Sequence, residues 1–567
     1  MSFDVCVIGS GAGAGPIIYE LSRAGYKVLV LEKGPWIKTE EFSKDEMTAT
    51  MRDAYLPNLA DERHVIESPK SNGQWEAENT YDSGADYWNG SAVGGSSNFM
   101  SAYFHRLKPK DFRLLSEYGV IKGGNVVDWP ITYDELEPFY AKVESVVGLC
   151  GQVTDHKFQE PRSTADFPYP PLPSNIIAKW YQEAAAKEGW ALITAPRGII
   201  SRPKDDRRAC YASNYCGSFG CSSDAKGSSR AALLPHALAT ANCTVKAQCK
   251  VFKFDTDPSG KITSVYFYNE NDEEESVSAG IFVVACQAVE TSRLLLMSKT
   301  KEYPNGLANN CGLVGKNLLF AGGGSGSGYI RYDDLSETDR KEFSKPITFV
   351  NKALQEFYEF DDSEFGGLAK GGTIDFLLEH SNPMPKAHRN RFDDGTLLYG
   401  SKLKERLHDY FTQQRRIRFE IFCDWTPNDD CNVTLDPEVT DKWGDPVGRI
   451  KIGTVRHDVN VGNYLAQKAK KVLENVGAKN ISVGVGGSPP TNLMAGGCRF
   501  GNDPKTSVLN KNCRAHEVSN LYVTDGSFMP TGGSVPPTLT IYANSFRVAE
   551  QMIKELGGPK TSPEVAG

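Results

Sequence analysis

The sequence predicts an α/β fold with a central parallel sheet and a second part built on an antiparallel sheet with helices. Residues 4–8 form a short apolar run, a glycine cluster and a helical stretch over 16–23 follow, and 27–31 form a second apolar run. A parallel pair of strands needs such a helical crossover. Alternating, aromatic-rich stretches within 331–450, such as 416–425, predict the strands of the second part.

The glycine-rich turn after the first strand predicts a dinucleotide site. Gly9, Gly11, Gly13 and Ala14 fit the pattern G-x-G-x-x-G/A between a strand and a helix. The first glycine permits a tight turn, the second lets backbone approach a pyrophosphate, and a small residue at the end lets helix pack on strand. Glu32 ends the second strand, where a carboxylate accepts hydrogen bonds from ribose hydroxyls and repels a 2′-phosphate. A glycine-rich turn in a purely structural unit is the alternative.

The other segments extend this pattern along the chain. Helical patterns cover 134–147, 174–188, 458–477 and 541–556, whereas 243–289 alternates like strands and ends in an apolar run. We expect a discontinuous nucleotide-binding domain, a substrate domain and a flexible tail. The nucleotide-binding domain is expected to cover 1–115, 195–330 and 485–556. The substrate domain is expected to cover 116–194 and 331–484, and the tail 557–567.

Composition excludes several classes of protein. Apolar residues make up 40% of the 567 residues and charged residues 24%, as in soluble globular proteins. The net charge of −8 and the lack of a Lys/Arg block argue against nucleic acid or an anionic membrane surface as a partner. No apolar run is long enough to predict a membrane span. The N-terminus shows no signal-peptide pattern, so we expect a cytoplasmic location; export with a partner subunit, which would leave no trace in this chain, is the alternative.

Four further segments narrow the choice of dinucleotide. They are the Gly/Ser-rich residues 90–98, the stretch 129–140, and the two C-terminal stretches 520–530 and 537–541. Together they resemble the glucose-methanol-choline (GMC) family of FAD oxidoreductases, and most of all its branch of sugar and polyol dehydrogenase large subunits. The resemblance covers nearly the whole chain.

The resemblance implies how FAD would be held. In the family the second glycine loop lines the flavin, Asp525 and Gly526 approach the phosphate and ribitol, and Thr538 lies close to the ring. Phe99 stands where some members carry a histidine that binds flavin covalently, so we expect non-covalent FAD. Beyond the first turn, the positions assigned to FAD are Gly94, Gly95, Ser96, Ser97, Asn98, Val251, Asp525, Gly526 and Thr538.

The usual catalytic base of the family is missing. Leu493 stands where the family has a histidine, and Pro536 stands where a second histidine or asparagine precedes the Pro-Thr-Leu-Thr run. Neither side chain accepts a proton. Three interpretations stay open: oxidation with a base from elsewhere, flavin chemistry that needs no such base, such as desaturation, and loss of oxidation, as in a flavin-bound lyase or isomerase or a non-catalytic flavoprotein.

The sequence offers few candidates to replace the missing catalytic base. His457, beside Asp458 before a helix, is a candidate base, with a structural pair at the helix start as the alternative. Arg499 and Asn544 are candidates for polarising an oxygen near the flavin, but neither is a neutral base. His516 is expected to be structural. Three more histidines, His380, His388 and His408, lie within 331–450, and the sequence pattern does not rank them as candidate bases.

A cysteine-containing loop raises the question of a metal cluster. Cys210, Cys216 and Cys221 are spaced C-x5-C-x4-C, and three thiolates from one loop suit iron. The resembled dehydrogenase subunits carry a 3Fe-4S cluster here, with a shorter last spacing and a proline where this chain has Ser222. Reduced structural thiols, and a disulfide or another metal, are the alternatives. Because the thirteen cysteines are scattered, most are expected to be reduced core thiols.

Taken together, the sequence predicts an FAD-dependent oxidoreductase with a non-standard active site, and a dehydrogenase is favoured over an oxidase. Its expected substrate is an alcohol, a sugar or a related small organic molecule. If a cluster is present, we expect an electron-acceptor subunit or cytochrome as a partner. Without a cluster, oxygen or a soluble compound remains a possible electron acceptor. The identity of the substrate and the oligomeric state do not follow from the sequence.

Overall fold

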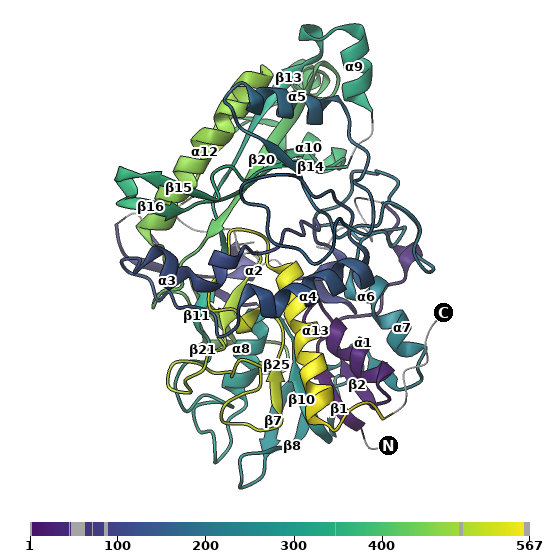
Figure 1. Cartoon of the computed structure of the whole chain (residues 1–567), viewed down its shortest axis with the longest axis vertical. Coiled ribbons are helices and arrows are strands. Elements are labelled where there is room, and N and C mark those ends of the chain that lie inside the picture. Colours follow the sequence, from purple (N-terminus) through teal and green to yellow (C-terminus); the bar gives the residue numbers. More distant parts are fainter. Residues whose placement is uncertain are drawn as a thin grey trace.

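The fold has two lobes, seen in a computed structural model that describes residues 3–44, 46, 63–70, 72–83, 89–345, 348–486 and 492–560. Figure 1 shows the first and last elements, β1 (Phe3–Ile8) and α13 (Thr538–Glu555), together in the lower lobe. The upper lobe is built along one long helix, α12 (Arg456–Val476). The chain therefore returns to its starting lobe at the end, as the discontinuous arrangement requires.

A five-stranded parallel sheet forms the centre of the lower lobe. Val5 of β1 pairs with Ile281 on one side and with Val28 on the other, and all pairings in this sheet are parallel. Such strands are nearly continuous apolar runs because both faces of the sheet are covered. The strand order is β25 (Leu521–Val523), β10 (Ala279–Val284), β1, β2 (Val28–Leu31), β6 (Cys243–Lys246). The predicted α/β fold with a parallel sheet is confirmed.

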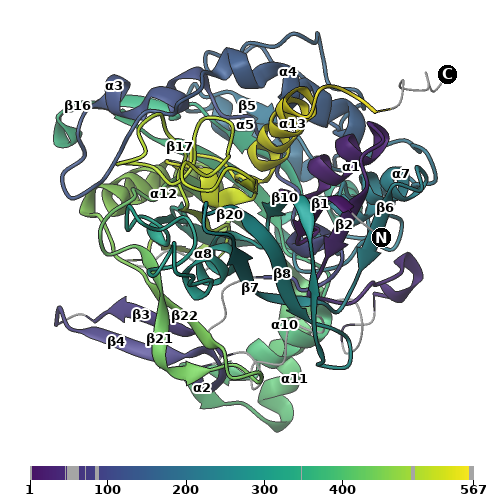
Figure 2. The same cartoon turned by 90° about the horizontal axis from the view of Figure 1, so that it is seen from below.

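Helices cover one face of this sheet and an antiparallel sheet approaches the other. Helix α1 (Gly15–Arg23) has Pro16 in its first turn, where a missing N–H costs no helical bond, and it packs beside α13. Figure 2 shows both helices on one side of the parallel strands. From the opposite side, Phe254 contacts Phe282 of β10 edge-on at 5.9 Å. Phe254 belongs to the three-stranded sheet β7 (Lys250–Thr256), β8 (Ile262–Tyr268), β9 (Glu274–Val277).

A seven-stranded antiparallel sheet forms the upper lobe. Its central strand is β20 (Gln414–Asp424), whose residues Ile417 and Phe419 pack in one cluster with Leu465 and Val472 of α12. Its order is β23 (Lys479–Gly484), β13 (Ser325–Arg331), β20, β17 (Gly372–Leu378), β14 (Val350–Leu354), β5 (Leu192–Thr194), and β12 (Ala321–Gly322) also pairs with β20. Residues 325–330 were expected in the nucleotide-binding domain; because β13 pairs with β20 along its whole length, it belongs to the upper sheet.

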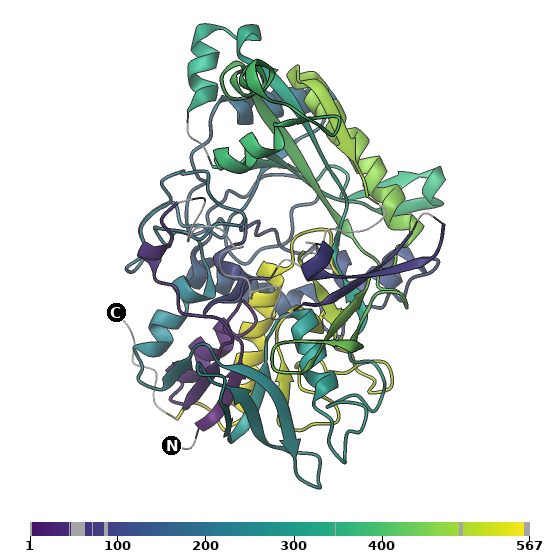
Figure 3. The same cartoon turned by 180° about the vertical axis from the view of Figure 1, so that it is seen from behind.

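A mixed six-stranded sheet joins the lobes along one side. Its only parallel pair is β22 with β3, where Ile450 pairs with Ile66. Figure 3 shows the hairpin β3–β4 beside β21 and β22 from behind. The order is β24 (Ala495–Gly497), β11 (Lys316–Leu319), β21 (Asn432–Thr440), β22 (Pro446–Lys451), β3 (Val65–Pro69), β4 (Trp75–Asn79).

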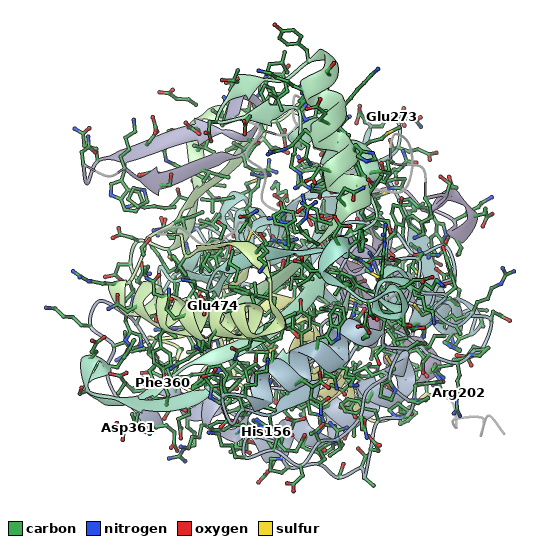
Figure 4. All side chains as sticks on the ribbon, turned by 90° about the horizontal axis from the view of Figure 1, so that it is seen from above. His156, Arg202, Glu273, Phe360, Asp361 and Glu474 are labelled. Atoms are coloured by element: carbon green, nitrogen blue, oxygen red, sulfur yellow. The ribbon has the colours of Figure 1, made fainter. Side chains whose placement is uncertain are left out.

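The remaining elements lie around these sheets. Thr132 caps α4, where its side chain accepts a hydrogen bond from the Glu135 amide. Phe360 of the hairpin β15–β16 stacks on Tyr464 of α12 at 4.0 Å; in Figure 4 the labels Phe360 and Asp361 mark this hairpin, and Glu474 marks the end of α12. The helices are α2 (Thr80–Ser83), α3 (Leu114–Tyr118), α4 (Tyr133–Val143), α5 (Ile176–Ala186), α6 (Ser229–Ala232), α7 (Leu234–Leu238), α8 (Ala288–Met297), α9 (Glu337–Ser344), α10 (Pro383–Arg389) and α11 (Gly400–His408). The short strands are β15 (Glu359–Asp362), β16 (Gly367–Lys370), β18 (Phe392–Asp393) and β19 (Thr396–Leu397).

Candidate active site

A cavity of about 840 Å³ lies where the two lobes meet. Its lower wall contains the first glycine turn and the end of β2, and its upper wall contains β12, the start of β13 and part of β20. The cavity falls in the size range of pockets that enclose organic ligands. A single cavity therefore connects the predicted nucleotide turn with side chains of the antiparallel sheet.

The glycines of the first turn have three different surroundings. A Cβ on Gly9, whose φ is +92°, would lie 2.4 Å from the Ala285 carbonyl oxygen. A Cβ on Gly13 would lie 2.5 Å from the Cα of Asp525. A Cβ on Gly11 would meet nothing closer than 3.8 Å, and Gly11 lines the cavity. The first and third glycines are thus needed for packing, whereas the second keeps the cavity open to a phosphate.

The two glycine loops meet at the cavity. A Cβ on Gly95 would lie 3.0 Å from the Cα of Gly11, and Gly95 has a φ of +57°. The Ser10 hydroxyl links the loops further, because it accepts a hydrogen bond from the Gly94 amide (2.8 Å) and donates one to Glu32 (2.5 Å). Ser10 was not predicted to take part. It has no motif of its own, and only its contacts reveal the role.

Glu32 is buried and lines the cavity at the end of β2. Its carboxylate accepts hydrogen bonds from the Ser10 hydroxyl and from the Gly34 amide at 2.9 Å. Burial raises the pKa of this carboxyl. An acceptor in this position suits the hydroxyls of an adenosine ribose.

The second loop is held by its own polar side chains. Ser97 donates to the Gly94 carbonyl (2.5 Å), and Asn98 donates to the Val93 carbonyl (2.9 Å). Gly95, Ser96 and Ser97 line the cavity, whereas Gly94 and Asn98 stand behind them, as Ala14 does in the first turn. Part of the predicted set thus supports the wall and does not form it.

The C-terminal positions complete the lower wall. Asp525 is buried, and its carboxylate accepts hydrogen bonds from the amides of Gln287 (3.0 Å) and Ser527 (2.9 Å). Burial raises the pKa of this carboxyl. Gly526, Thr538 and Val251 also line the cavity. Apart from the three supporting residues, all positions predicted to hold the nucleotide lie along this one wall.

Both positions of the missing base line the cavity. Leu493, in the left-handed region at φ +54°, packs against an apolar cluster that includes Tyr103, Phe349 and Phe422. Pro536 lines the cavity as well. The wall at these positions offers no proton acceptor.

The three predicted replacements lie elsewhere. His457 sits in the first turn of α12 and contacts Phe365 edge-on at 6.0 Å, while Asp458 accepts hydrogen bonds from Thr426 and does not orient it. Arg499 donates to the carbonyl of Thr506, and Asn544 donates to Cys513 Sγ. None of His457, Arg499 and Asn544 is among the cavity-lining residues, so the structure does not bring them to the cavity, and a catalytic role for them stays a prediction. His516 shares a hydrogen bond with Ser507 (3.0 Å).

The polar side chains at the upper end of the cavity were missed. They come from the loop after the second glycine loop, from the residues just after β17, from the end of α10 and from β20. For β20 a signal existed in the sequence, because alternate residues of a strand face the same side and charged residues alternate with apolar ones along 416–421. They are Tyr103, His380, Arg389, Arg418 and Glu420.

The cysteine loop is packed without a metal-binding group. Cys216 joins the cluster around Tyr103, whereas Cys210 and Cys221 pack against a separate cluster. Across the described residues, no three His, Cys, Asp or Glu side chains are placed to hold a metal ion. The loop is instead held by the buried Lys226 ammonium, which donates to the backbone carbonyls of Asn98 (3.1 Å), Cys216 (2.9 Å) and Phe219 (2.8 Å). Burial, with the nearby Cys216 and Cys221, raises the pKa of the Cys210 thiol to about 11, so the three thiols lie near one another. Even so, the predicted iron–sulfur ligand set is not supported by their placement.

Comparison with known protein families finds two matching segments of the chain. The N-terminal model described as GMC oxidoreductase matches residues 78–320, and the C-terminal model matches residues 427–545.

Several curated proteins match almost end to end. A 2-methyl-1,2-propanediol dehydrogenase from Mycolicibacterium austroafricanum is 30% identical over 572 residues, covering 96% of this chain and 94% of that protein. A paromamine 6'-oxidase from Streptomyces fradiae is 29% identical, covering 98% and 92%. The fructose dehydrogenase large subunit from Gluconobacter japonicus is 25% identical, covering 98% of each.

Solved structures share the fold. Formate oxidase from Aspergillus oryzae RIB40, in an R554K variant, aligns with a TM-score of 0.62 at 14% identity over 98% of each chain. A pyridoxine 4-oxidase aligns with a TM-score of 0.59 at 15% identity, covering 97% of this chain and 99% of that one. Within the described residues, no helix combines the length and apolar character that crossing a membrane demands.

Proposed function

From the premise that this chain belongs to the GMC oxidoreductase family, we propose that it oxidises a hydroxyl group of a small diol, polyol or sugar. It is an FAD-dependent oxidoreductase, and dehydrogenases are among its relatives. One observation carries the proposal: a single cavity joins the glycine loops to a polar end on the antiparallel sheet. A hydroxyl substrate at that end would lie in the same enclosed space as the flavin.

The residues of the lower wall fit FAD. The start of α1 and the open face of Gly11 would receive the pyrophosphate, because free backbone N–H groups at a helix start bind anions. Glu32 would accept hydrogen bonds from the ribose, and Thr538 and the Ser96–Ser97 backbone would line the flavin. When bound, FAD supplies the acceptor for a hydride.

The flavin is proposed to be held without a covalent bond. Phe99, at the position where a covalent histidine would stand, is buried and contacts Phe42 edge-on at 6.2 Å. A phenyl ring forms no bond to flavin. Precipitation of the protein should therefore release FAD into the supernatant.

The polar end of the cavity suits a substrate with several hydroxyl groups. Tyr103 and Arg418 supply hydrogen-bond donors, and Glu420 supplies an acceptor. The apolar rings of Phe349 and Phe422 lie in the same wall and exclude water from the site. The names of the relatives, which include a propanediol and a fructose dehydrogenase, favour the same substrate class.

Electrons are proposed to leave through a separate acceptor. Two relatives are named as parts of larger enzymes, a fructose dehydrogenase large subunit and a gluconate 2-dehydrogenase flavoprotein. An acceptor subunit or cytochrome would play this role here. The cytoplasmic location, with export alongside a partner subunit as the alternative, stays a prediction.

Anaerobic flavin reduction tests the proposed function. The purified holoenzyme is mixed with 1,2-diols, polyols and sugars, and the visible absorption of oxidised flavin is followed. Substrates of the proposed class should bleach it, and a quinone or dye should restore it faster than oxygen does. Failure of every hydroxyl compound to bleach the flavin, or product formation with the flavin still oxidised, would contradict the proposal.

A further inference from the structure

We propose that Glu420 is the catalytic base, accepting the hydroxyl proton of the substrate in place of the histidine that Leu493 replaces. The inference rests on the proposed function, because it assigns a residue to that same reaction.

The strand places Glu420 in the cavity wall. Alternate residues of β20 face the same side of the sheet, so Arg418, Glu420 and Phe422 line the cavity while Phe419 packs toward α12. Neighbouring strands hold Glu420 in register, opposite Ser325 of β13. A residue in the middle of a paired strand is held more precisely than one on a loop.

This carboxylate and the position of the missing base border the same group of side chains. Leu493 packs against the cluster that contains Tyr103 and Phe422, and both Leu493 and Glu420 line the cavity. The Tyr103 hydroxyl donates a hydrogen bond to Glu420 Oε2 at 3.1 Å. The carboxylate is thus bonded to a member of the cluster against which Leu493 packs.

The second carboxylate oxygen is available to a substrate. Glu420 Oε1 forms an ion pair with Arg418 Nη2 at 3.8 Å, which is longer than a hydrogen bond, and it accepts no hydrogen bond from the described residues. The side chain is 33% exposed, and its exposed part borders the cavity. A hydroxyl entering the cavity can therefore donate its proton to Oε1.

The other polar groups in the wall are poor bases. Burial, with the nearby charge of Arg418, lowers the pKa of His380 to about 3, so its imidazole holds a proton weakly. Burial and the Glu420 and Asp375 carboxylates raise the pKa of Tyr103, which stays a donor. Arg389 and Arg418 are cations.

The remaining carboxylates of the wall are already engaged. Glu32 and Asp525 accept hydrogen bonds from the glycine loop and from backbone amides. Glu290 is paired with His64 at 3.0 Å. Glu420 is left as the carboxylate at the substrate end.

Burial makes Glu420 a stronger base than an exposed glutamate, because it raises the pKa of the carboxyl. The charge of Arg418 and the Tyr103 hydrogen bond lower that pKa, but by less than burial raises it. Asp375 of β17, which is itself bonded to His105 at 3.2 Å, adds the smallest contribution and raises it. A carboxyl whose pKa is raised toward the working pH is a better proton acceptor, as general base catalysis requires.

The proton and electron balance is complete. The substrate O–H bond would break and its proton would go to Glu420 Oε1, while the adjacent C–H bond would break and its electron pair would leave as hydride, for which FAD would supply the acceptor. The C–O bond becomes a carbonyl. The proton on Glu420 is then returned to solvent through the cavity.

The main test compares Glu420→Gln with the wild-type holoenzyme in anaerobic stopped-flow flavin reduction across pH. We expect the wild-type rate to rise with pH through one ionisation and reach a plateau. In Glu420→Gln the rate should fall about 10²–10⁴-fold and lose that ionisation, with FAD content unchanged. Glu420→Asp should keep the ionisation and part of the rate. Asp458→Asn, which removes a buried carboxyl outside the cavity, should match the wild type.

A second readout does not depend on activity. Glu32, Asp458 and Asp525 also have raised pKa values, so the readout is the difference between the wild-type and Glu420→Gln infrared spectra. That difference should contain one C=O band of a protonated carboxyl that titrates above the ordinary glutamate range. A wild-type rate and pH profile in Glu420→Gln, or a slower rate with the same profile and band, would overturn the inference. If no hydroxyl compound reduces wild-type flavin, the proposed function fails, and the infrared band still reports on Glu420 separately.

Discussion

Two alanine substitutions in the first glycine turn separate cofactor binding from folding. In Gly11→Ala the new Cβ meets nothing closer than 3.8 Å, an ordinary contact, but it enters the cavity where the pyrophosphate would lie. In Gly13→Ala the new Cβ lies 2.5 Å from the Cα of Asp525 and 2.7 Å from the Thr524 carbonyl oxygen. Both neighbours are backbone atoms and cannot rotate away.

The expected magnitudes follow from these distances. Carbon atoms pack at about 3.5–4.0 Å, so Gly13→Ala requires α1 and the residues after β25 to separate by roughly 1 Å. Such overpacking costs about 1–3 kcal/mol. For Gly11→Ala we expect the unfolding free energy of the apoprotein to stay within about 0.5 kcal/mol. Its FAD affinity should fall at least about tenfold, equivalent to 1.4 kcal/mol.

The assay measures FAD content after purification, thermal unfolding of the apoprotein, and FAD affinity by flavin fluorescence quenching. Gly11→Ala should lose FAD and keep its melting temperature, whereas Gly13→Ala should lose both. If Gly11→Ala binds FAD as tightly as the wild type, the pyrophosphate does not lie against this turn and the reasoning is refuted.

Three further substitutions test the charges that hold the fold. Burial raises the pKa of Asp458 to about 7 from the ordinary 3.8. The folded wild-type protein should therefore lose on the order of 4 kcal/mol of unfolding free energy as the pH rises from about 4 to 7, where the buried carboxyl must ionise. In Asp458→Asn the unfolding free energy, measured against pH, should not show this decrease. Lys226→Met leaves three buried carbonyls without this donor, so the unfolding free energy in denaturant should fall by at least about 3 kcal/mol. An unchanged denaturation midpoint would show that water replaces the ammonium. Arg106→Met removes two buried ion pairs, one with Glu144 (2.7 Å) and one with Glu137 (2.9 Å), while Glu144 keeps its second partner, Arg162. The substitution should cost about 3 kcal/mol in unfolding free energy, part of which Glu144→Gln in the same chain should recover.

Local patterns in the sequence were enough to predict the nucleotide half of the molecule. The strand–turn–helix unit, the spacing of Gly9, Gly11 and Gly13, and the acid at Glu32 depend on neighbours within one βαβ unit, where residue spacing determines position. The helices α5, α12 and α13 lie within a few residues of their predicted ranges, because their apolar periodicity is strong. The GMC resemblance, based on long segments in order, is confirmed by the family models.

Only the tertiary structure decided the substrate half. Glu420 and Tyr103 are 317 residues apart in the sequence, and their hydrogen bond exists because β20 pairs at the centre of the upper sheet. His457 has the right chemistry for a base, but its place in the first turn of α12 puts it outside the cavity wall. The cysteine spacing left open whether the loop holds a cluster, and only the placement of the side chains showed that no three of them among the described residues are positioned to hold a metal ion. The sequence determines which groups are present, whereas long-range strand pairing determines which of them share a cavity.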